Sequence, residues 1–204
     1  AEEVECLFAY LLGMPLAILL DTKGPEIRLK AIEGGKTELV AGQKFILTSE
    51  EVIGNNERVS ITYKNLKSDI SVGSTILIDD GLIEMVVEEI EETDIICTVI
   101  NGGPISNNKG VNVPGAVLSM PYISDVDRSD IMFGCDMGFD YLAASFVRSK
   151  EDVLEVRKII EESGSHMKII AKIESMQGIR NLEEILEVSD GIMVARGDLG
   201  VEIP

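Results

Sequence analysis

The chain of 204 residues is 45% hydrophobic and carries a formal net charge of −18, so it can bury a core and does not have the composition of a disordered segment. Proteins that bind nucleic acids or anionic membranes do so through a basic surface. The excess of acidic residues argues against such a surface, so we expect neither partner. One histidine and three widely spaced cysteines nearly exclude a zinc site, a Ser-His-Asp triad and a disulfide framework, which points to a reducing, cytoplasmic compartment.

The first 26 residues combine a helix pattern with a buried strand. Apolar residues recur at helical spacing over residues 4–12, and Gly13 stands where a helix end is expected. A continuous apolar run over residues 15–20 then stops at Asp21, which predicts a strand buried on both faces, as in a parallel sheet. The acidic N-terminus lacks the layout of a signal peptide, and no apolar run reaches the roughly 20 residues of a membrane span.

From about residue 27 to residue 121 the pattern changes to short β-rich runs separated by turn signals such as Asp79-Asp80-Gly81. The expected strands cover residues 38–40, 44–47, 59–61, 75–78, 82–87, 95–100 and 111–113. They predict a small all-β domain with a barrel-like or meander topology. Proline punctuation near residues 25 and 121 would serve as its hinges.

After residue 121 the chain returns to strands that alternate with helices. Buried strands are expected at 141–147, 168–173 and 191–195, with helical patterns between them. The pitch suits a (β/α)₈ barrel interrupted by the β domain, while a doubly wound sheet is the alternative, although no GxGxxG follows these strands. Four strand units make half a barrel, so we expect a piece of a longer protein. The expected division is 1–26 and 122–204 for the barrel and 27–121 for the insert.

Charged residues cluster at the carboxyl ends of the predicted strands, where barrel enzymes carry their chemistry. Lys172 and Glu174 share the inward face of one strand, and Asp198 is expected to continue the inward face of the next. Two carboxylates suit a hard cation such as Mg²⁺, and the lysine would supply positive charge for a phosphoryl or enolate oxygen. The alternative is a set of inter-strand ion pairs, which the position at the strand ends disfavours.

The loop at residues 103–110 resembles a phosphate-binding loop only loosely. It lacks the Gly-Lys-Ser/Thr order, and no helix pattern follows it. Lys109 could contact a nucleotide phosphate from the β domain, and a solvated loop lysine is an equally good interpretation.

Five segments together resemble pyruvate kinases, in the order and with the inserted domain of that family. They are LDTKGPEIR at 20–28, IDDG at 78–81, KGVNVPG at 109–115, IAKIE at 170–174 and VARGDLG at 194–200. The resemblance implies a (β/α)₈ barrel with a β-rich lid, and transfer of a phosphoryl group from phosphoenolpyruvate to ADP, giving pyruvate and ATP in glycolysis. It also implies Mg²⁺ or Mn²⁺ and K⁺ as cofactors, a cytoplasmic location and a homotetrameric parent protein.

Carried over by position, the resemblance assigns roles to the barrel residues. Glu174 and Asp198 would bind Mg²⁺, and Lys172 would stabilise charge on the transferring phosphoryl group. The backbone amides of Gly197 and Asp198 would hold the substrate carboxylate at the start of a helix.

The resemblance also assigns residues around the first strand end and in the lid. Asp21 and Thr22 would be K⁺ ligands. Arg28 and Lys109 would contact nucleotide phosphates, and Arg28 could pair with Asp79 when the lid closes.

Two other functions stay open at this point. One is a binding module that retains affinity for Mg²⁺ and phosphate without turnover. The other is a related barrel enzyme that uses phosphoenolpyruvate in a different reaction, which the motif at 21–28 together with the insert disfavours. Family members also have further barrel strands and a C-terminal domain for which these residues contain no counterpart, so the expected activity belongs to a longer protein.

Overall fold

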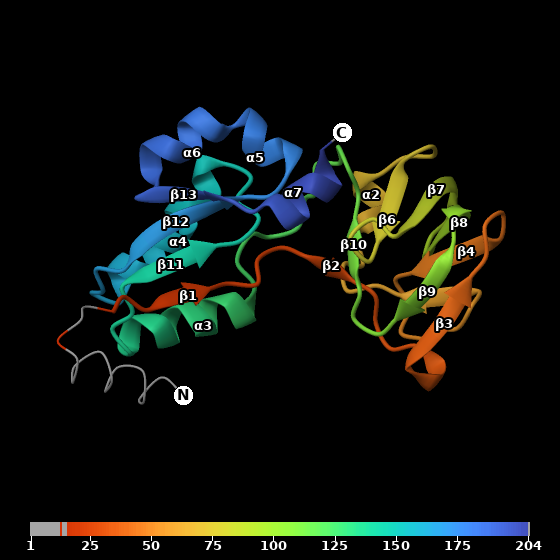
Figure 1. Cartoon of the computed structure of the whole chain (residues 1–204), viewed down its shortest axis with the longest axis horizontal. Coiled ribbons are helices and arrows are strands. Elements are labelled where there is room, and N and C mark those ends of the chain that lie inside the picture. The colour runs from red at the N-terminus through yellow and green to blue at the C-terminus, as the bar shows by residue number, and fades with distance from the viewer. Residues whose placement is uncertain (1–12, 14–15, 204) are drawn as a thin grey trace.

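The computed structural model describes residue 13 and residues 16–203, and they form two parts that lie side by side (Figure 1). One part is a parallel sheet with helices packed against it. The other is built mostly of antiparallel strands. The helix predicted over residues 4–12 lies outside the described residues.

Four parallel strands form the first sheet, in the order β1-β11-β12-β13. They are β1 (Leu19–Asp21), β11 (Tyr141–Ala144), β12 (Lys168–Ile173) and β13 (Gly191–Val194). The strand predicted at 15–20 is wrong in its bounds, because the pairing with β11 begins only at Leu19. The strand predicted at 141–147 ends early, since Phe146 has a positive φ of 52° that extended backbone does not adopt. The expected parallel arrangement of βα units is confirmed.

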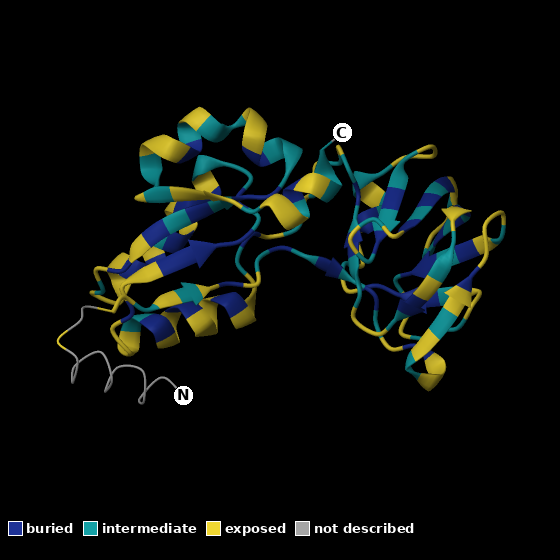
Figure 2. Ribbon diagram, in the orientation of Figure 1, coloured by how far each residue is buried: buried dark blue, intermediate teal, exposed yellow. Residues whose placement is uncertain are grey.

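Helices cover this sheet and bury its apolar side chains. They are α3 (Asp125–Asp136), α4 (Lys150–Glu162), α5 (Met176–Arg180), α6 (Leu182–Val188) and α7 (Arg196–Glu202). On β12, Ile169, Ala171 and Ile173 alternate into the core, as the two-residue period of a strand requires (Figure 2). Helix α3 was not predicted from the sequence, although Ser124 and Asp127 form a capping box at its start.

The end of the last strand differs from the prediction. The alternating pattern was expected to carry Asp198 on the inward face of a strand, but β13 ends at Val194 and α7 begins at Arg196. Asp198 therefore lies in the first turn of a helix, where the family resemblance had put the start of a helix. The strand pattern was wrong because Gly197 and Gly200 give no helical period that would mark the end of the strand.

The second part contains a seven-stranded sheet in the order β2-β10-β6-β7-β8-β4-β5. Its strands are β2 (Ile27–Arg28), β4 (Lys44–Thr48), β5 (Arg58–Ser60), β6 (Thr75–Ile78), β7 (Ile83–Ile90), β8 (Asp94–Asn101) and β10 (Gly110–Asn112). A separate pair joins β3 (Lys36–Leu39) to β9 (Gly103–Ser106). Two short helices complete it, η1 (Glu33–Gly35) and α2 (Leu66–Asp69).

All seven β runs expected from the sequence are strands, with bounds that shift by a few residues. Two strands were missed. β2 has two residues and is too short for any period to register, and β9 contains Pro104, which argues against a strand away from a sheet edge. The core of this part is mostly apolar, with Phe45, Leu47 and Met85 at 0% exposure, and the hydroxyl groups of the buried Thr48 and Ser60 are hydrogen-bonded.

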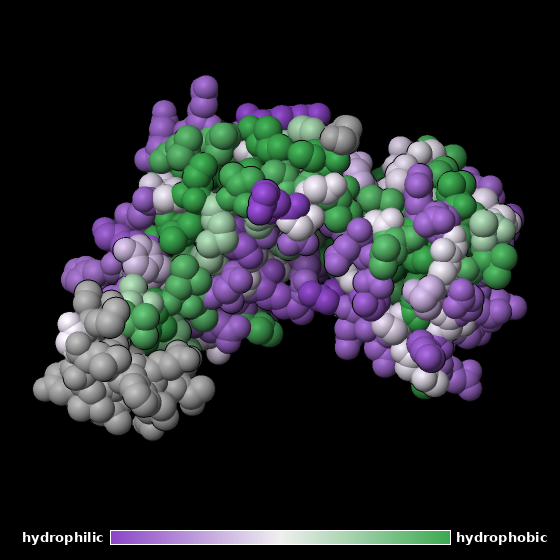
Figure 3. Space-filling model, in the orientation of Figure 1, coloured by the Kyte–Doolittle hydropathy of each residue, from purple (hydrophilic) through white to green (hydrophobic). Residues whose placement is uncertain are grey.

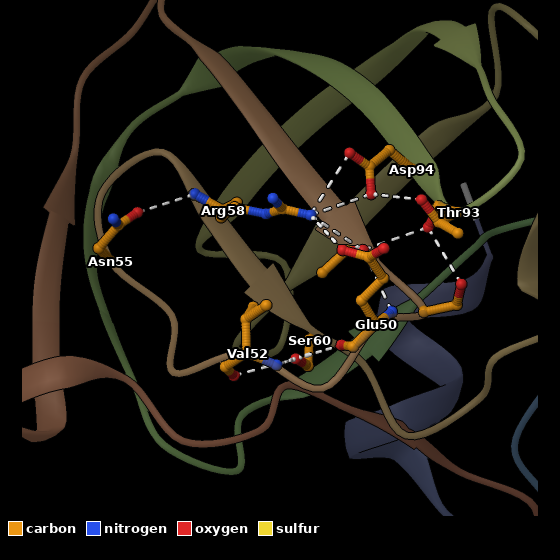
Figure 4. A network of polar contacts seen from close by, with 9 residues as sticks. Glu50, Val52, Asn55, Arg58, Ser60, Thr93 and Asp94 are labelled. Atoms are coloured by element: carbon orange, nitrogen blue, oxygen red, sulfur yellow. Dashed lines mark hydrogen bonds and ion pairs between the residues drawn. The ribbon is translucent and has the colours of Figure 1, made fainter.

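A network of ion pairs and hydrogen bonds surrounds Arg58 in this β part (Figure 4). The Nη2 of Arg58 on β5 lies 3.3 Å from a carboxylate oxygen of Glu50 and 3.2 Å from one of Asp94. The hydroxyl of Ser60 donates to the carbonyl of Glu50 at 2.7 Å. The network ties β5, the last strand of the sheet, to β8 and to the turn after β4.

Two chain segments connect the two parts, one over residues 22–26 and one over residues 113–121 (Figure 1). Both connections run past the carboxyl end of β1 and β11. In the described part of the chain, no helix has the length and apolar character to cross a membrane.

Candidate active site

A cavity of about 630 Å³ lies between the two parts, at the carboxyl ends of the parallel strands. Polar side chains gather in this hollow, as Figure 3 shows between the two halves of the molecule. Of the nine residues singled out from the sequence, eight line it: Asp21, Thr22, Arg28, Asp79, Lys109, Lys172, Glu174 and Asp198. Gly197 is exposed on α7 and lies outside this lining.

Lys172 lies on the side of the cavity that the parallel sheet forms. Its Nζ is 3.1 Å from a carboxylate oxygen of Asp21, 3.2 Å from one of Glu174 and 2.9 Å from the hydroxyl of Ser145. Its side chain is only 13% exposed. Burial lowers the pKa of Lys172, but the two carboxylates outweigh burial and raise it above its usual value. The ammonium is therefore a fixed positive charge held by three oxygens.

Glu174 is a buried carboxylate, with 1% of its side chain exposed. One oxygen lies near Lys172, and the other accepts a hydrogen bond from the backbone N–H of Phe146 at 2.6 Å. Burial raises the pKa of Glu174, the Asp198 carboxylate adds to that effect, and the contacts to Phe146 and Lys172 oppose it. The net direction is upward, so the group takes up a proton more readily than an ordinary glutamate.

Ser145, which the sequence analysis did not single out, links the first two strand ends. Its hydroxyl donates to the carbonyl oxygen of Thr22 at 2.6 Å and accepts from Lys172. Its N–H donates to the hydroxyl of Thr22 at 3.2 Å. The strand expected at 141–147 placed Ser145 inside a strand, whereas β11 ends at Ala144 and leaves Ser145 at the strand end.

Backbone strain marks the residue after Ser145. Phe146 adopts φ 52°, a left-handed conformation that is rare for a bulky residue. The turn aims its N–H at Glu174. Nothing in the sequence pattern predicts a positive φ at a phenylalanine, so the sequence alone does not predict this contact.

Gly24, in the first connection, is required by a close approach. It has φ +72°, and a Cβ at this position would lie 2.7 Å from the carbonyl oxygen of Ser145. Its N–H donates to Asp127 at 3.2 Å. The backbone of the connection can therefore pass directly over the strand end that carries Ser145.

Helix α7 brings two carboxylates to the cavity. Asp198 lies in its first turn, close enough to Glu174 to raise the pKa of that group. Glu202 accepts a hydrogen bond from the side-chain amide of Asn112 on β10 at 2.9 Å. Burial raises the pKa of Glu202, against the effect of that hydrogen bond. Asn112 and Glu202 thus join the β part to the helix that carries Asp198.

The basic residues predicted for nucleotide binding face the cavity from the β part. The guanidinium of Arg28 pairs with Glu26 at 2.6 Å and donates to the carbonyl of Asn108 at 2.7 Å. Lys109 pairs with Asp79 at 2.8 Å. Asp79 therefore has Lys109 as its partner in this structure, and the predicted pair between Arg28 and Asp79 is not formed here.

The carboxylates of the cavity are candidate ligands for a metal ion. Within residues 16–203, no group of three or more His, Cys, Asp or Glu side chains converges in a metal-binding arrangement. The carboxylates of Glu174 and Asp198 are the type and number of protein ligands that Mg²⁺ commonly takes, with its other positions left to water and substrate. The residues present therefore fit a magnesium ion that is completed by a phosphorylated ligand.

Comparisons with known proteins agree with these observations. Residues 4–204 match the family model described as the barrel domain of pyruvate kinase. The chain is 52% identical to a pyruvate kinase of Geobacillus stearothermophilus over 195 residues, which is 94% of this chain and 33% of that protein. It is 53% identical to one of Clostridium perfringens over 190 residues, which is 92% of this chain and 40% of that protein.

A solved structure is similar over nearly the whole chain. It is a crystal structure of a pyruvate kinase from Cryptosporidium parvum, with a TM-score of 0.90 and 43% identity, and the match covers 96% of this chain and 42% of that one. The chain thus spans about a third to two fifths of the length of the relatives it matches. With a family model that matches it from residue 4 to its last residue, the chain belongs to the pyruvate kinase family.

Proposed function

We propose that this chain carries part of the active site of an enzyme that transfers a phosphoryl group from phosphoenolpyruvate to ADP, giving pyruvate and ATP in glycolysis. The observation that carries the proposal is the position of Lys172. Its ammonium lies among Asp21, Ser145 and Glu174 at the strand ends, across one cavity from Arg28 and Lys109. Phosphoryl transfer depends on positioning and on positive charge that stabilises the transferring group, and side chains of this kind line one cavity here.

In this proposal the parallel sheet is part of a (β/α)₈ barrel and the antiparallel part is its lid. The proposed division is 1–26 and 122–204 for the barrel and 27–121 for the lid. The exposure of β13 supports the larger barrel, because Ile192, Met193 and Val194 are 38–55% exposed on a strand that ends the sheet. Apolar surface also shows over the parallel sheet in Figure 3. Further strands would cover such side chains.

Glu174 and Asp198 would hold Mg²⁺ or Mn²⁺, with the remaining positions left to water and substrate oxygens. When bound, the cation supplies positive charge against the phosphoryl oxygens. Asp21 and Thr22 would be ligands of K⁺. Lys172 lies between these two proposed cation sites, and its ion pairs with Asp21 and Glu174 hold its ammonium in place.

During transfer, a phosphate oxygen of ADP attacks phosphorus as the bond from phosphorus to the enol oxygen breaks. The electron pair of that bond stays on the enol oxygen, which becomes an enolate and later takes a proton at carbon to give pyruvate. Lys172 would stabilise the negative charge on the enolate and phosphoryl oxygens. Its charge is already oriented before the reaction, so little reorganisation is needed as the charge develops.

The remaining contacts concern binding. The backbone amides of Gly197 and Asp198, at the start of α7, would hold the substrate carboxylate. Arg28 and Lys109 would contact the phosphates of ADP or ATP, and Arg28 would exchange Glu26 for Asp79 when the lid closes. The full protein would be a cytoplasmic homotetramer, by analogy with the family.

Turnover of a chimera tests the proposal. Residues 4–204 replace the matching segment of the Geobacillus stearothermophilus enzyme, and pyruvate formation from phosphoenolpyruvate and ADP is measured with Mg²⁺ and K⁺. The chimera is expected to turn over. A folded chimera that binds Mg²⁺ and phosphoenolpyruvate but forms no pyruvate would instead support a binding module.

A further inference from the structure

The connection that returns from the lid to the barrel is held from both sides over residues 118–120, which we call the clamped segment. From the barrel, Nη1 of Arg148 donates to the carbonyl oxygens of Leu118 at 3.1 Å and Met120 at 3.0 Å. From the lid, Asp69 of α2 accepts from the N–H and from the hydroxyl of Ser119, each at 2.8 Å. Successive residues of one short segment are thus bound by opposite halves of the molecule.

Arg148 is itself fixed in place. Its Nε and Nη2 donate to the two carboxylate oxygens of Asp152 at 3.1 and 3.3 Å. Its guanidinium carbon lies 5.7 Å from the ring centroid of Tyr122, and the side chain is 15% exposed. A bidentate ion pair in a partly buried place holds the planar guanidinium in one orientation. The clamped segment is therefore tied to a rigid point of the barrel.

The same point lies next to the catalytic cluster. Arg148 closely follows Ser145 and Phe146 along the chain. Ser145 accepts a hydrogen bond from Lys172, and the N–H of Phe146 donates one to Glu174, so these two residues orient both side chains. The hydroxyl of Tyr122, just beyond the clamped segment, donates to the carbonyl oxygen of Ser145 at 2.9 Å. A displacement of the clamped segment would thus act on Ser145 and Phe146 at the end of β11, and through them on the side chains of Lys172 and Glu174 at the end of β12.

On the basis of the function proposed above, we propose that Arg148 is a positioning residue that fixes the clamped segment to this strand end and thereby couples the orientation of the lid to the alignment of Lys172 and Glu174. A purely local role would be to stabilise the start of α4, since the N–H of Arg148 also donates to Asp152. Such a role would not require the bonds to Leu118 and Met120.

Distance distributions within the chain test the coupling directly. Dyes attached through unnatural amino acids at the exposed positions Asn56 and Glu161 report the separation of lid and barrel. Arg148→Met should widen the distribution at least about twofold, because two charge-assisted bonds to the connection are lost. Arg157→Met is the matched control, since Arg157 donates to the carbonyl of Val188 and to Asp190, away from the lid. An unchanged width in Arg148→Met, or equal widening in both variants, would overturn the proposal.

A second variant separates positioning from folding. Arg148→Lys retains a positive charge near Asp152, so it should keep the melting temperature close to that of the wild type. A single ammonium cannot hold Asp152 in two places and also reach both carbonyls. The distribution should therefore stay wide in Arg148→Lys. A wild-type width in this variant would show that charge alone is sufficient and would refute the assigned geometry.

Kinetics of the chimera give the readout at the active site. Arg148→Met should raise the KM for ADP by about tenfold or more, the range expected from loss of hydrogen bonds to a charged group. The kcat should fall as well, because Lys172 and Glu174 lose the alignment that Ser145 and Phe146 give them, whereas the KM for phosphoenolpyruvate should change less, since its proposed carboxylate site at the start of α7 makes no contact with Arg148. An inactive chimera with Arg148 intact would count against the proposed function, whereas the dye measurement on the chain would still decide the role of Arg148.

Discussion

Lys172 is the residue on which the proposed chemistry depends most. Asp21, Ser145 and Glu174 surround its ammonium within 3.2 Å, although they come from three different strand ends. An ion pair that served only stability would not need to lie on the wall of a cavity that also contains Arg28 and Lys109. The position of this charge on the cavity wall therefore favours a role in phosphoryl transfer over a purely stabilising ion pair.

Replacement of Lys172 should affect turnover more than binding. In the chimera, Lys172→Met is expected to lower kcat by about 10²- to 10³-fold, the usual cost of removing one preorganised group. Lys172→Arg should not restore activity, because a planar fork places its charge differently from a compact ammonium. Lys168→Met is the control, since Lys168 lies on the same strand, 59% exposed, and pairs with Asp190. Near-normal turnover in Lys172→Met would make Lys172 a structural partner of Glu174.

Metal affinity should depend on pH through Glu174. The pKa of this carboxyl is raised by burial, so below that pKa the protonated form predominates and cannot serve as a charged ligand. We expect Mn²⁺ affinity of the chain, measured by electron paramagnetic resonance, to fall from pH 7 to pH 5.5. Glu174→Gln should weaken binding by at least about tenfold at pH 7 and flatten the pH dependence. Glu183→Gln, at an exposed position on α6, should leave both unchanged.

At the scale of elements, alternation and strand ends account for most of what could be predicted. Lys172 and Glu174 were found because a two-residue period and the carboxyl-end rule are both legible in the sequence. The residue pattern missed helix α7 because its glycines hide a helical period, and only the family resemblance placed a helix start there. Phe146 could not be found at all, since a positive φ at a large residue is imposed by tertiary contacts and has no sequence signature.

Asp190 joins three elements and should show how the βα units are held together. It accepts from the N–H of Ile169 and from Arg157, each at 2.9 Å, and lies 3.4 Å from Lys168. Burial alone would raise its pKa, but these contacts outweigh it and lower the pKa below the ordinary value of an aspartate. Its contribution to stability is therefore present above the ordinary aspartate pKa of the unfolded chain and lost as the pH falls through the lower folded-state pKa.

We expect Asp190→Asn to reduce the free energy of unfolding by about 1 kcal/mol at pH 7, a value kept small because the side chain is 27% exposed. At pH 3 the difference from the wild type should shrink. Urea unfolding measures the difference in the free energy of unfolding between variant and wild type at each pH. Asp136→Asn, at an exposed position, is the control. A larger difference at pH 3 would contradict the lowered pKa.

At the scale of the whole molecule, the hydrogen bond between Asn112 and Glu202 is a direct contact between the β part and α7. Its loss should favour a more open arrangement by about fivefold in population, as expected for one hydrogen bond of about 1 kcal/mol. Asn112→Ala should therefore increase the radius of gyration measured by small-angle X-ray scattering. Asn101→Ala removes a similar bond to the carbonyl of Leu82 within the β part and should not. Equal scattering curves for Asn112→Ala and the wild type would show that this contact does not hold the β part against α7.

The location of a bound metal tests the central claim most directly, namely that the strand-end cluster around Lys172 is the phosphoryl-transfer site. Crystals of the chimera grown with Mn²⁺ and phosphoenolpyruvate would reveal the ion by its anomalous scattering. We predict one peak within ligand distance of carboxylate oxygens of both Glu174 and Asp198, with Nζ of Lys172 against an oxygen of the substrate. A metal and substrate bound elsewhere, with Lys172 still paired only to Asp21 and Glu174, would contradict the assignment.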